Sequence, residues 1–192
     1  QSTASRLKNI AATKTITIAY RSDATPFSFT DETKQIGGFS IDLCKRVVAS
    51  IEQQLKIQGL QVKWHPVTVQ KRFDAVAKGQ ADMECGSSTV TLGRMKQVDF
   101  STFVFIESTG MAVSKASNIS TFSDMTGKKI AVISGSTNEQ AINAQLKQQK
   151  IEAIVVPVKD RAEGVAMLEA GTVDGFASDK LLLVGAEFKN PD

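Results

Sequence analysis

The stretch of sequence that decides the fold is residues 76–82 (VAKGQAD), because a similar stretch, residues 168–174 (LEAGTVD), appears in the second half of the chain. In both stretches a helical pattern ends at a glycine, and a short apolar strand follows the aspartate. Ser87 follows the first of these strands, and Asp179 follows the second at the same register. Joints of this kind also arise by chance, but the repeat favours two lobes of similar build.

Apolar periodicity predicts that strands and helices alternate along both halves. The predicted strands span residues 15–20, 61–67, 82–85, 129–133, 153–158 and 174–177, and the predicted helices span residues 39–56, 71–78, 138–149 and 162–170. This alternation indicates a parallel sheet with helices on both faces, built once in each lobe. Ligands of open α/β sheets sit beyond the carboxyl ends of the strands, so two such sheets are expected to face each other across a cleft.

The two lobes are predicted to be residues 1–105 and 106–192. The segment around their boundary, residues 103–108, is rich in β-forming residues and contains no Gly or Pro. This composition favours a stiff crossover strand that acts as a hinge over a flexible linker.

Composition argues against several classes of function. The 192 residues carry a formal net charge of +3 with scattered Lys and Arg, so binding to nucleic acid is not indicated. No stretch approaches the ~20 consecutive apolar residues of a membrane span, and no charged-then-apolar leader opens the sequence. The cysteines, Cys44 and Cys85, have neither CxxC nor metal-ligand spacing. Cys44 lies on the apolar face of a predicted helix, which favours a buried free thiol over a disulfide.

Arginines, hydroxyls and one acid gather just after the predicted strands. The positions that are candidates for ligand contact are Arg21, Arg72, Ser87, Thr89, Arg94, Thr137, Arg161 and Asp179. A guanidinium binds a carboxylate through two parallel hydrogen bonds, and a strand-end carboxylate such as Asp179 suits an ammonium group. A single arginine at such a position is more often a solvated surface residue than a ligand contact. Four of them predict a zwitterion with an extra negative charge, which describes a dicarboxylic amino acid.

The order and spacing of these residues carry a family resemblance. The chain resembles family 3 of the solute-binding proteins of bacterial amino-acid ABC transporters, and within it the glutamate/aspartate-binding branch. The resemblance extends over nearly all of residues 10–192. Its motifs are residues 20–23 (YRSD), 26–29 (PFSF), 38–43 (GFSIDL), 84–89 (ECGSST), 134–137 (SGST) and 159–160 (KD), together with Arg94 and residues 100–101 (FS).

The resemblance implies a two-lobed α/β fold of the type II periplasmic-binding-protein class. It implies that Arg94 clamps the α-carboxylate of the ligand, assisted by Ser87, Thr89 and the amides and hydroxyl near Thr137. Asp179 would then take the α-ammonium group. The resemblance further implies a periplasmic or extracytoplasmic location, an ABC permease as partner, closure about the hinge, and no cofactor, metal site or catalytic residue.

The same resemblance assigns Arg21 and Arg72 to the side-chain carboxylate of an acidic ligand, and two departures bear on this specificity. Val69 stands where the family pattern has a serine, so one hydrogen-bond donor is lost. Arg161 stands where the glutamate/aspartate branch has a histidine. Glutamate, aspartate and a different anionic amino acid therefore all stay open.

A third departure concerns the end of the sequence. Members of the family continue past the last helix of the second lobe, return to the sheet of the first lobe as a second crossover strand, and cover that lobe with terminal helices. We therefore expect the first lobe of this chain to lack the return strand and those helices.

Two other classes of protein compete with this interpretation. The first is an enzyme on the same fold, such as a dehydratase, for which Glu84 and Glu107 are the candidate acids; His65, within a predicted strand, favours a structural role. No Ser/His/Asp set, metal site or phosphate loop supports an enzyme. The second is the ligand-binding domain of a membrane sensor or receptor.

Overall fold

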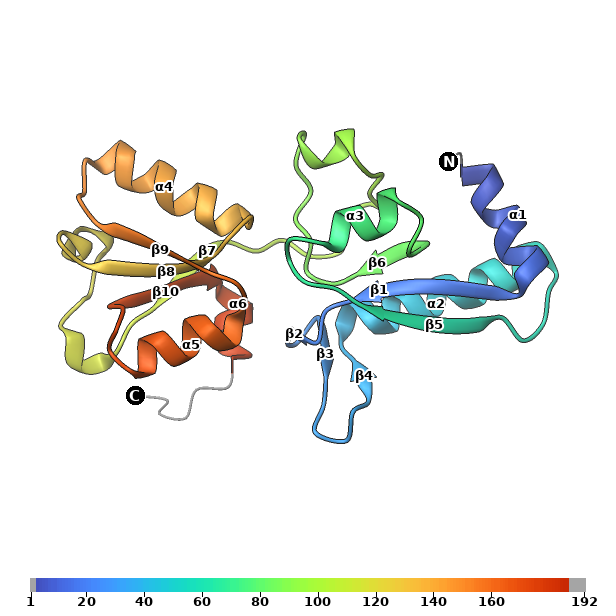
Figure 1. The fold of residues 1–192 in the computed structure, drawn as a ribbon, viewed down its shortest axis with the longest axis horizontal. Coiled ribbons are helices and arrows are strands. Elements are labelled where there is room, and N and C mark those ends of the chain that lie inside the picture. Colours follow the sequence, from blue (N-terminus) through green and yellow to red (C-terminus); the bar gives the residue numbers. More distant parts are fainter. Residues whose placement is uncertain (1–2, 187–192) are drawn as a thin grey trace. The chain divides into compact units, whose positions relative to one another are not determined.

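The computed structural model describes residues 3–186, and the chain divides into two compact units, residues 1–102 (unit 1) and residues 103–192 (unit 2) (Figure 1). In both units a mainly parallel sheet carries helices, as the alternating pattern predicts. The expected α/β architecture is confirmed for each unit.

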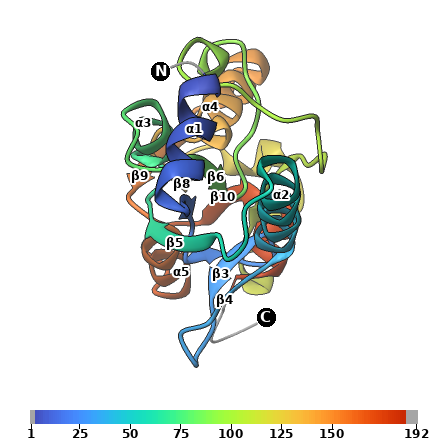
Figure 2. The ribbon, with the colours of Figure 1, turned by 90° about the vertical axis from the view of Figure 1, so that its right-hand side faces the viewer.

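Unit 1 is built on a three-stranded sheet with the order β5-β1-β6. Strand β1 (Thr15–Tyr20) is central and runs parallel to both β5 (Gln61–Pro66) and β6 (Met83–Cys85). Helix α2 (Phe39–Leu55) and helix α3 (Arg72–Ala77) lie on opposite sides of this sheet (Figure 2). Parallel strands open their carboxyl ends at one edge, so the loops after β1 and β6 begin close together.

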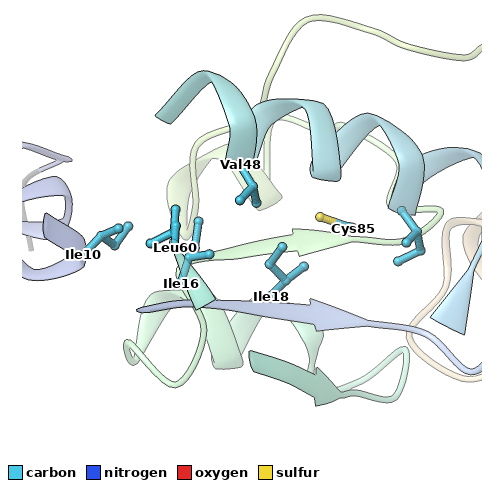
Figure 3. Close-up of a cluster of buried hydrophobic side chains, with 7 residues drawn as sticks. Ile10, Ile16, Ile18, Val48, Leu60 and Cys85 are labelled. Carbon is cyan, nitrogen blue, oxygen red and sulfur yellow. The ribbon is translucent and has the colours of Figure 1, made fainter. Parts of the chain in front are cut away.

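The core of unit 1 lies between β1 and α2. Ile16 and Ile18 alternate along β1 and point to the same face, where they pack with Val48 of α2 and with Leu60 (Figure 3). Helix α1 (Thr3–Thr13), which the sequence pattern did not predict, adds Ile10 to the same cluster.

A second, small antiparallel sheet branches from unit 1 just after β1. It consists of β2 (Asp23–Ala24), β3 (Ser28–Thr30) and β4 (Ile36–Gly37), in that order. Sequence patterning predicted only a turn here, because strands of two or three residues are too short to show periodicity. The 3₁₀ helix η1 (Arg94–Lys96) follows β6 along the chain.

Unit 2 repeats the arrangement of unit 1 with one additional strand. Its sheet has the order β7-β10-β8-β9. The strands are β7 (Thr109–Ala112), β8 (Lys129–Ile133), β9 (Ile154–Val158) and β10 (Gly175–Asp179), and only β7 runs antiparallel to its neighbour. Helix α4 (Thr137–Gln149) covers one face and α5 (Arg161–Glu169) the other (Figure 1). The short helix α6 (Lys180–Val184) follows β10, and η2 (Lys115–Ser117) and η3 (Phe122–Met125) lie between β7 and β8.

The repeated stretch of sequence makes the same contacts in the two units. The Asp82 carboxylate accepts a hydrogen bond from the backbone N–H of Thr17 at 2.8 Å, and the Asp174 carboxylate accepts one from Lys129 N–H at 2.8 Å. Each aspartate N–H also donates to the carbonyl of the same strand residue. The two aspartates therefore hydrogen-bond to equivalent strands, β1 and β8. This shared role explains why residues 76–82 and 168–174 have similar sequences.

The prediction of a crossover strand at residues 103–108 is wrong. In the described part of the chain these residues pair with no strand, and β7 begins only at Thr109. Phe103 and Ile106 are largely exposed. β-Forming residues need a neighbouring strand to complete their hydrogen bonds, and none is supplied here.

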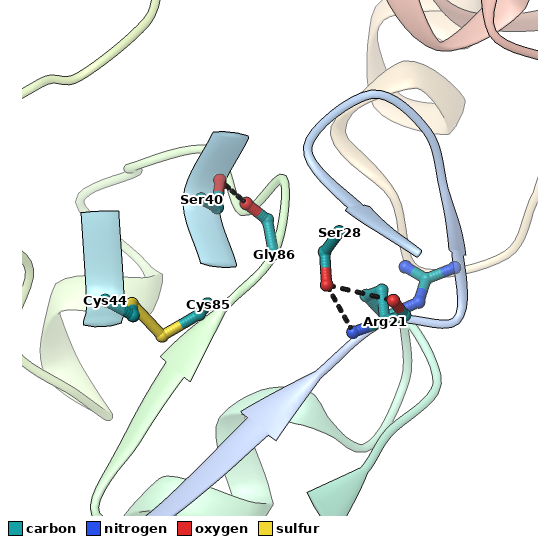
Figure 4. The surroundings of a disulfide bond; sticks show 6 residues. All are labelled: Arg21, Ser28, Ser40, Cys44, Cys85 and Gly86. Atoms are coloured by element: carbon teal, nitrogen blue, oxygen red, sulfur yellow. Dashed lines mark hydrogen bonds between the residues drawn. A yellow bond between two sulfur atoms is a disulfide. The ribbon is translucent and has the colours of Figure 1, made fainter. Parts of the chain in front are cut away.

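The prediction of a free thiol at Cys44 is also wrong, because Cys44 and Cys85 form a disulfide (Figure 4). Helix α2 passes over the end of β6 with 6.4 Å between the two Cα atoms, which lies within the range that a disulfide requires. The two cysteines are 41 positions apart in the sequence, and this separation hides their proximity from the sequence pattern.

No helix in residues 3–186 is long enough and apolar enough to span a membrane.

Candidate ligand-binding site

Arg21 is held in a fixed position immediately after β1. Its N–H donates to the Ser28 hydroxyl at 3.0 Å, and that hydroxyl donates back to the Arg21 carbonyl at 2.9 Å (Figure 4). Its guanidinium pairs with Asp23 at 2.5 Å, and the residue is only 3% exposed. The small sheet therefore anchors this arginine through the backbone and through the side chain.

Arg72 and Arg94 come from different elements and meet at one aromatic ring. Arg72 is the first residue of α3 and Arg94 the first residue of η1. Each guanidinium carbon lies 4.8 Å from the centre of the Phe73 ring. Phe73 in turn packs edge-on against Phe100 at 6.1 Å. Stacking on an aromatic face orients a guanidinium and leaves its N–H edge available for hydrogen bonds.

Glu84 is an acid that interacts with all three of these arginines. It belongs to β6, beside Ala19 of β1. The residue is partly exposed as a whole, but its Oε1 atom is fully buried, and no donor among the described residues bonds to that atom. Burial raises the pKa of the Glu84 carboxyl, while the Arg72 guanidinium, the Ser88 hydroxyl and the guanidiniums of Arg21 and Arg94 act in the opposite direction. Glu84 is therefore close enough to feel all three arginines.

The loop after β6 carries Ser87 and Thr89 and is tied down on both sides. The Ser40 hydroxyl of α2 donates to the Gly86 carbonyl at 2.7 Å (Figure 4). Arg94 Nη1 donates to the Thr89 carbonyl at 2.8 Å. The disulfide at Cys85 adds a covalent link to α2 directly before the loop. The hydroxyl-bearing loop thus starts from a rigid base.

The charges of this cluster do not cancel. The guanidiniums of Arg21, Arg72 and Arg94 supply three positive charges, and the carboxylates of Asp23 and Glu84 supply two negative ones when both are ionised. A net positive group of guanidiniums beside hydroxyls at the end of a sheet is suited to binding a carboxylate-bearing ligand. We call these five residues the arginine cluster.

In unit 2, the predicted contacts Thr137 and Asp179 lie at strand ends as expected. Thr137 is the first residue of α4, directly after the capping residue Ser136, whose hydroxyl accepts from Glu139 N–H at 3.1 Å. The Gly135 N–H is already taken by the Glu139 carboxylate at 2.8 Å. Asp179 ends β10 and precedes α6.

Arg161 lies in a different setting from the other predicted contacts. It begins α5, is 7% exposed, and its Nη1 donates to the Leu182 carbonyl of α6 at 3.1 Å. This contact fastens α6 to α5 within unit 2.

Glu107, a candidate acid for an enzyme, makes hydrogen bonds through both its carboxylate oxygens. One oxygen accepts from Ser108 N–H at 2.8 Å and the other from Leu181 N–H at 3.0 Å. It therefore caps the start of α6. Within residues 3–186, no group of three or more His, Cys, Asp or Glu side chains is placed so that it could hold a metal ion.

Sequence reasoning missed three members of this site. Asp23 was seen only as part of a motif, Phe73 as a helix residue, and Glu84 only as a candidate acid for an enzyme. The alternation of a short strand could have placed Glu84 beside a strand end, but no sequence signal links Phe73 to two arginines.

The chain is similar to proteins of one transport family. A family model described as bacterial extracellular solute-binding proteins, family 3, matches residues 16–154. The L-glutamate/L-aspartate-binding protein of Pseudomonas aeruginosa is 38% identical over 190 residues, covering 97% of this chain and 63% of that protein. The glutamate/aspartate import solute-binding protein of Escherichia coli is 33% identical over 190 residues, covering 98% of this chain and 63% of that protein. The chain thus spans less than two thirds of either relative.

Solved structures agree with these relatives on the fold. The crystal structure of the ancestral amino acid-binding protein AncCDT-1, a precursor of cyclohexadienyl dehydratase, matches with a TM-score of 0.79 and 28% identity. The match covers 93% of this chain and 76% of that one. The type II periplasmic-binding-protein fold predicted from the sequence is confirmed.

Proposed function

This chain belongs to family 3 of the bacterial extracellular solute-binding proteins, and we propose that within this family it captures an acidic amino acid, glutamate or aspartate. The captured amino acid would then be delivered to an ABC permease; the similarity to a glutamate/aspartate import solute-binding protein supports this role in import. The arginine cluster of unit 1 is the observation that carries the proposal.

The arginine cluster supports an acidic ligand through its surplus of positive charge. An acidic amino acid has two carboxylates and one ammonium group, so it brings the additional negative charge that neutral amino acids lack. The fixed positions of Arg21 and Arg72, which are 3% and 5% exposed, mean that little conformational entropy is lost when they bind. That Thr137, Arg161 and Asp179 of unit 2 contact the same ligand stays a prediction.

The proposal is tested by calorimetric titration of the protein with glutamate, aspartate, glutamine and asparagine. Glutamate or aspartate is expected to bind more tightly than its amide. Thermal unfolding provides an independent readout, because a ligand that binds only the folded state raises the melting temperature. Equal binding of acids and amides, or binding of neither, would contradict the proposal.

Replacing Arg94 should weaken every amino acid ligand. In the proposal Arg94 binds the α-carboxylate, which all amino acids share. A charge-assisted hydrogen bond contributes roughly 1.5–3 kcal/mol, so Arg94→Ala should raise the Kd of glutamate and of glutamine by about tenfold to a hundredfold. Arg46→Ala, at an exposed position of α2, removes the same charge and should change neither Kd. A loss confined to glutamate would show that Arg94 is wrongly assigned.

Replacing Arg72 should act on acidic ligands alone. Arg72 is proposed to meet the side-chain carboxylate, so Arg72→Ala should weaken glutamate by about tenfold or more and glutamine much less. The difference in affinity between glutamate and glutamine should therefore become smaller. Titration of the variant with each ligand would measure it. An equal loss for both would refute the side-chain assignment.

A further inference from the structure

The unusual feature of the arginine cluster is an acid where a site for anions should disfavour one. The guanidiniums of Arg72 and Arg94 share the Phe73 ring, and together with that of Arg21 they interact with the Glu84 carboxyl. Its buried Oε1 receives no hydrogen bond from the residues that the structure describes, and the neighbouring Ser88 hydroxyl, like the guanidiniums, lowers the pKa of the carboxyl. The interaction of its carboxylate with Arg72, Arg21 and Arg94 is one of opposite charges.

The absence of a side chain at Gly86 leaves space for this carboxyl group. A Cβ atom added at Gly86 would collide with Glu84 Oε1 and would lie 3.2 Å from Cγ of Arg21. The Glu84 carboxyl is thus folded over Gly86, against the aliphatic part of Arg21.

We propose, on the premise that the chain binds an acidic amino acid, that Glu84 determines specificity without touching the ligand: its carboxylate lowers the net charge of the arginine cluster and so limits the preference for a dicarboxylate over its neutral amide. Glu84 is in this sense a positioning residue that acts through Arg21, Arg72 and Arg94. With Glu84 ionised the cluster carries one positive charge in excess, and with Glu84 neutral it carries two.

The charged groups around Glu84 give the direction of its pH dependence. They are Arg21 after β1, Arg72 of α3 and Arg94 of η1, with Asp23 of β2 paired to Arg21. The pKa of Glu84 is already raised by burial. A second ligand carboxylate near the cluster raises it further, so glutamate binding takes up protons. Glutamate affinity should then fall as the pH rises from the pKa of Glu84 in the free protein through its pKa in the complex.

The test is Glu84→Gln, which keeps the shape of the side chain and removes the charge. At a pH where Glu84 is ionised, the ratio of glutamine Kd to glutamate Kd should increase by about three- to tenfold over the unmodified protein, as expected for one unit charge several ångströms from the ligand in a partly screened site. The ratio is informative because damage to the fold would weaken both ligands together. An unchanged ratio, or an equal loss for both ligands, would overturn the inference.

A second measurement does not depend on folding of the variant. Calorimetry of the unmodified protein in buffers with different heats of ionisation should show net proton uptake on binding glutamate and little on binding glutamine. Absence of this difference across the acidic range would also overturn the inference. If the unmodified protein binds glutamine as tightly as glutamate, or neither, the proposed function itself fails, and that result appears before any variant is compared.

Discussion

Replacement of Gly38 by alanine is expected to cost roughly 2–6 kcal/mol of folding stability, the sum of two penalties. Gly38 has φ 125° and ψ 164°, a backbone conformation that is essentially restricted to glycine. An added Cβ would also collide with the Phe27 carbonyl oxygen and lie 2.8 Å from the Ser28 nitrogen. These are backbone atoms, so no side-chain rotation can relieve the contact.

The Gly38→Ala replacement should also disturb the ligand-binding site. The Phe27 carbonyl accepts from Ser40 N–H at 2.9 Å, and the Ser28 hydroxyl holds Arg21. Backbone movement at Phe27 and Ser28 would therefore release Arg21 from its fixed position. We expect weaker glutamate binding in any Gly38→Ala protein that still folds.

The neighbouring Gly37 provides a matched control. It has no positive φ, and a Cβ at this position would lie 3.5 Å from the Phe29 ring, an ordinary contact. Urea unfolding followed by circular dichroism should show a Gly37→Ala midpoint close to that of the unmodified protein and a much lower one for Gly38→Ala. Similar midpoints for the two variants would contradict the strain assigned to Gly38.

Loss of the Cys44–Cys85 disulfide is the second change with a large expected effect. The bond closes a loop across 41 residues, and constraint of the unfolded chain by a loop of that length contributes about 3–4 kcal/mol. For a chain of this size the loss corresponds to a fall in melting temperature of about 10 °C. The double replacement Cys44→Ala with Cys85→Ala, followed by thermal unfolding, measures it.

Single replacements separate the cross-link from side-chain packing. Cys44→Ala alone already breaks the bond, so adding Cys85→Ala should lower the melting temperature little further. The unmodified protein treated with a reductant should melt near the double variant. If reduction leaves the melting temperature unchanged, the disulfide does not stabilise the fold. Because Cys85 lies between Glu84 and Gly86, the same variants should also show weaker ligand binding.

Periodicity in the sequence was sufficient to predict the framework. The strands β1 and β8 begin and end where predicted, and the ends of the other predicted strands and helices differ by one or two residues. The repeat at residues 76–82 and 168–174 was also readable, because the same fastening of a strand by an aspartate requires the same local sequence in both units. The family followed from motifs in a set order, which the family model bears out.

Other features depended on contacts between residues far apart in the chain. The sequence predicted a free thiol at Cys44, which was wrong because the fold brings Cys85 beside it. The sequence also predicted a strand at residues 103–108, which was wrong because the fold places no neighbouring strand there. Arg161 could be recognised as a strand-end arginine, but its bond to the Leu182 carbonyl could not.

The amino-acid sequence by itself determined the order of strands and helices, the two similar units and the set of arginines at strand ends, because helix and strand periods and turn residues act over a few neighbouring positions. Only the tertiary structure decided that Arg72 and Arg94 share the Phe73 ring and that the Glu84 carboxyl, with its Oε1 buried, interacts with three guanidiniums. Packing brings such groups together across tens of residues, and the charge that each one feels depends on the neighbours and on the water that packing excludes.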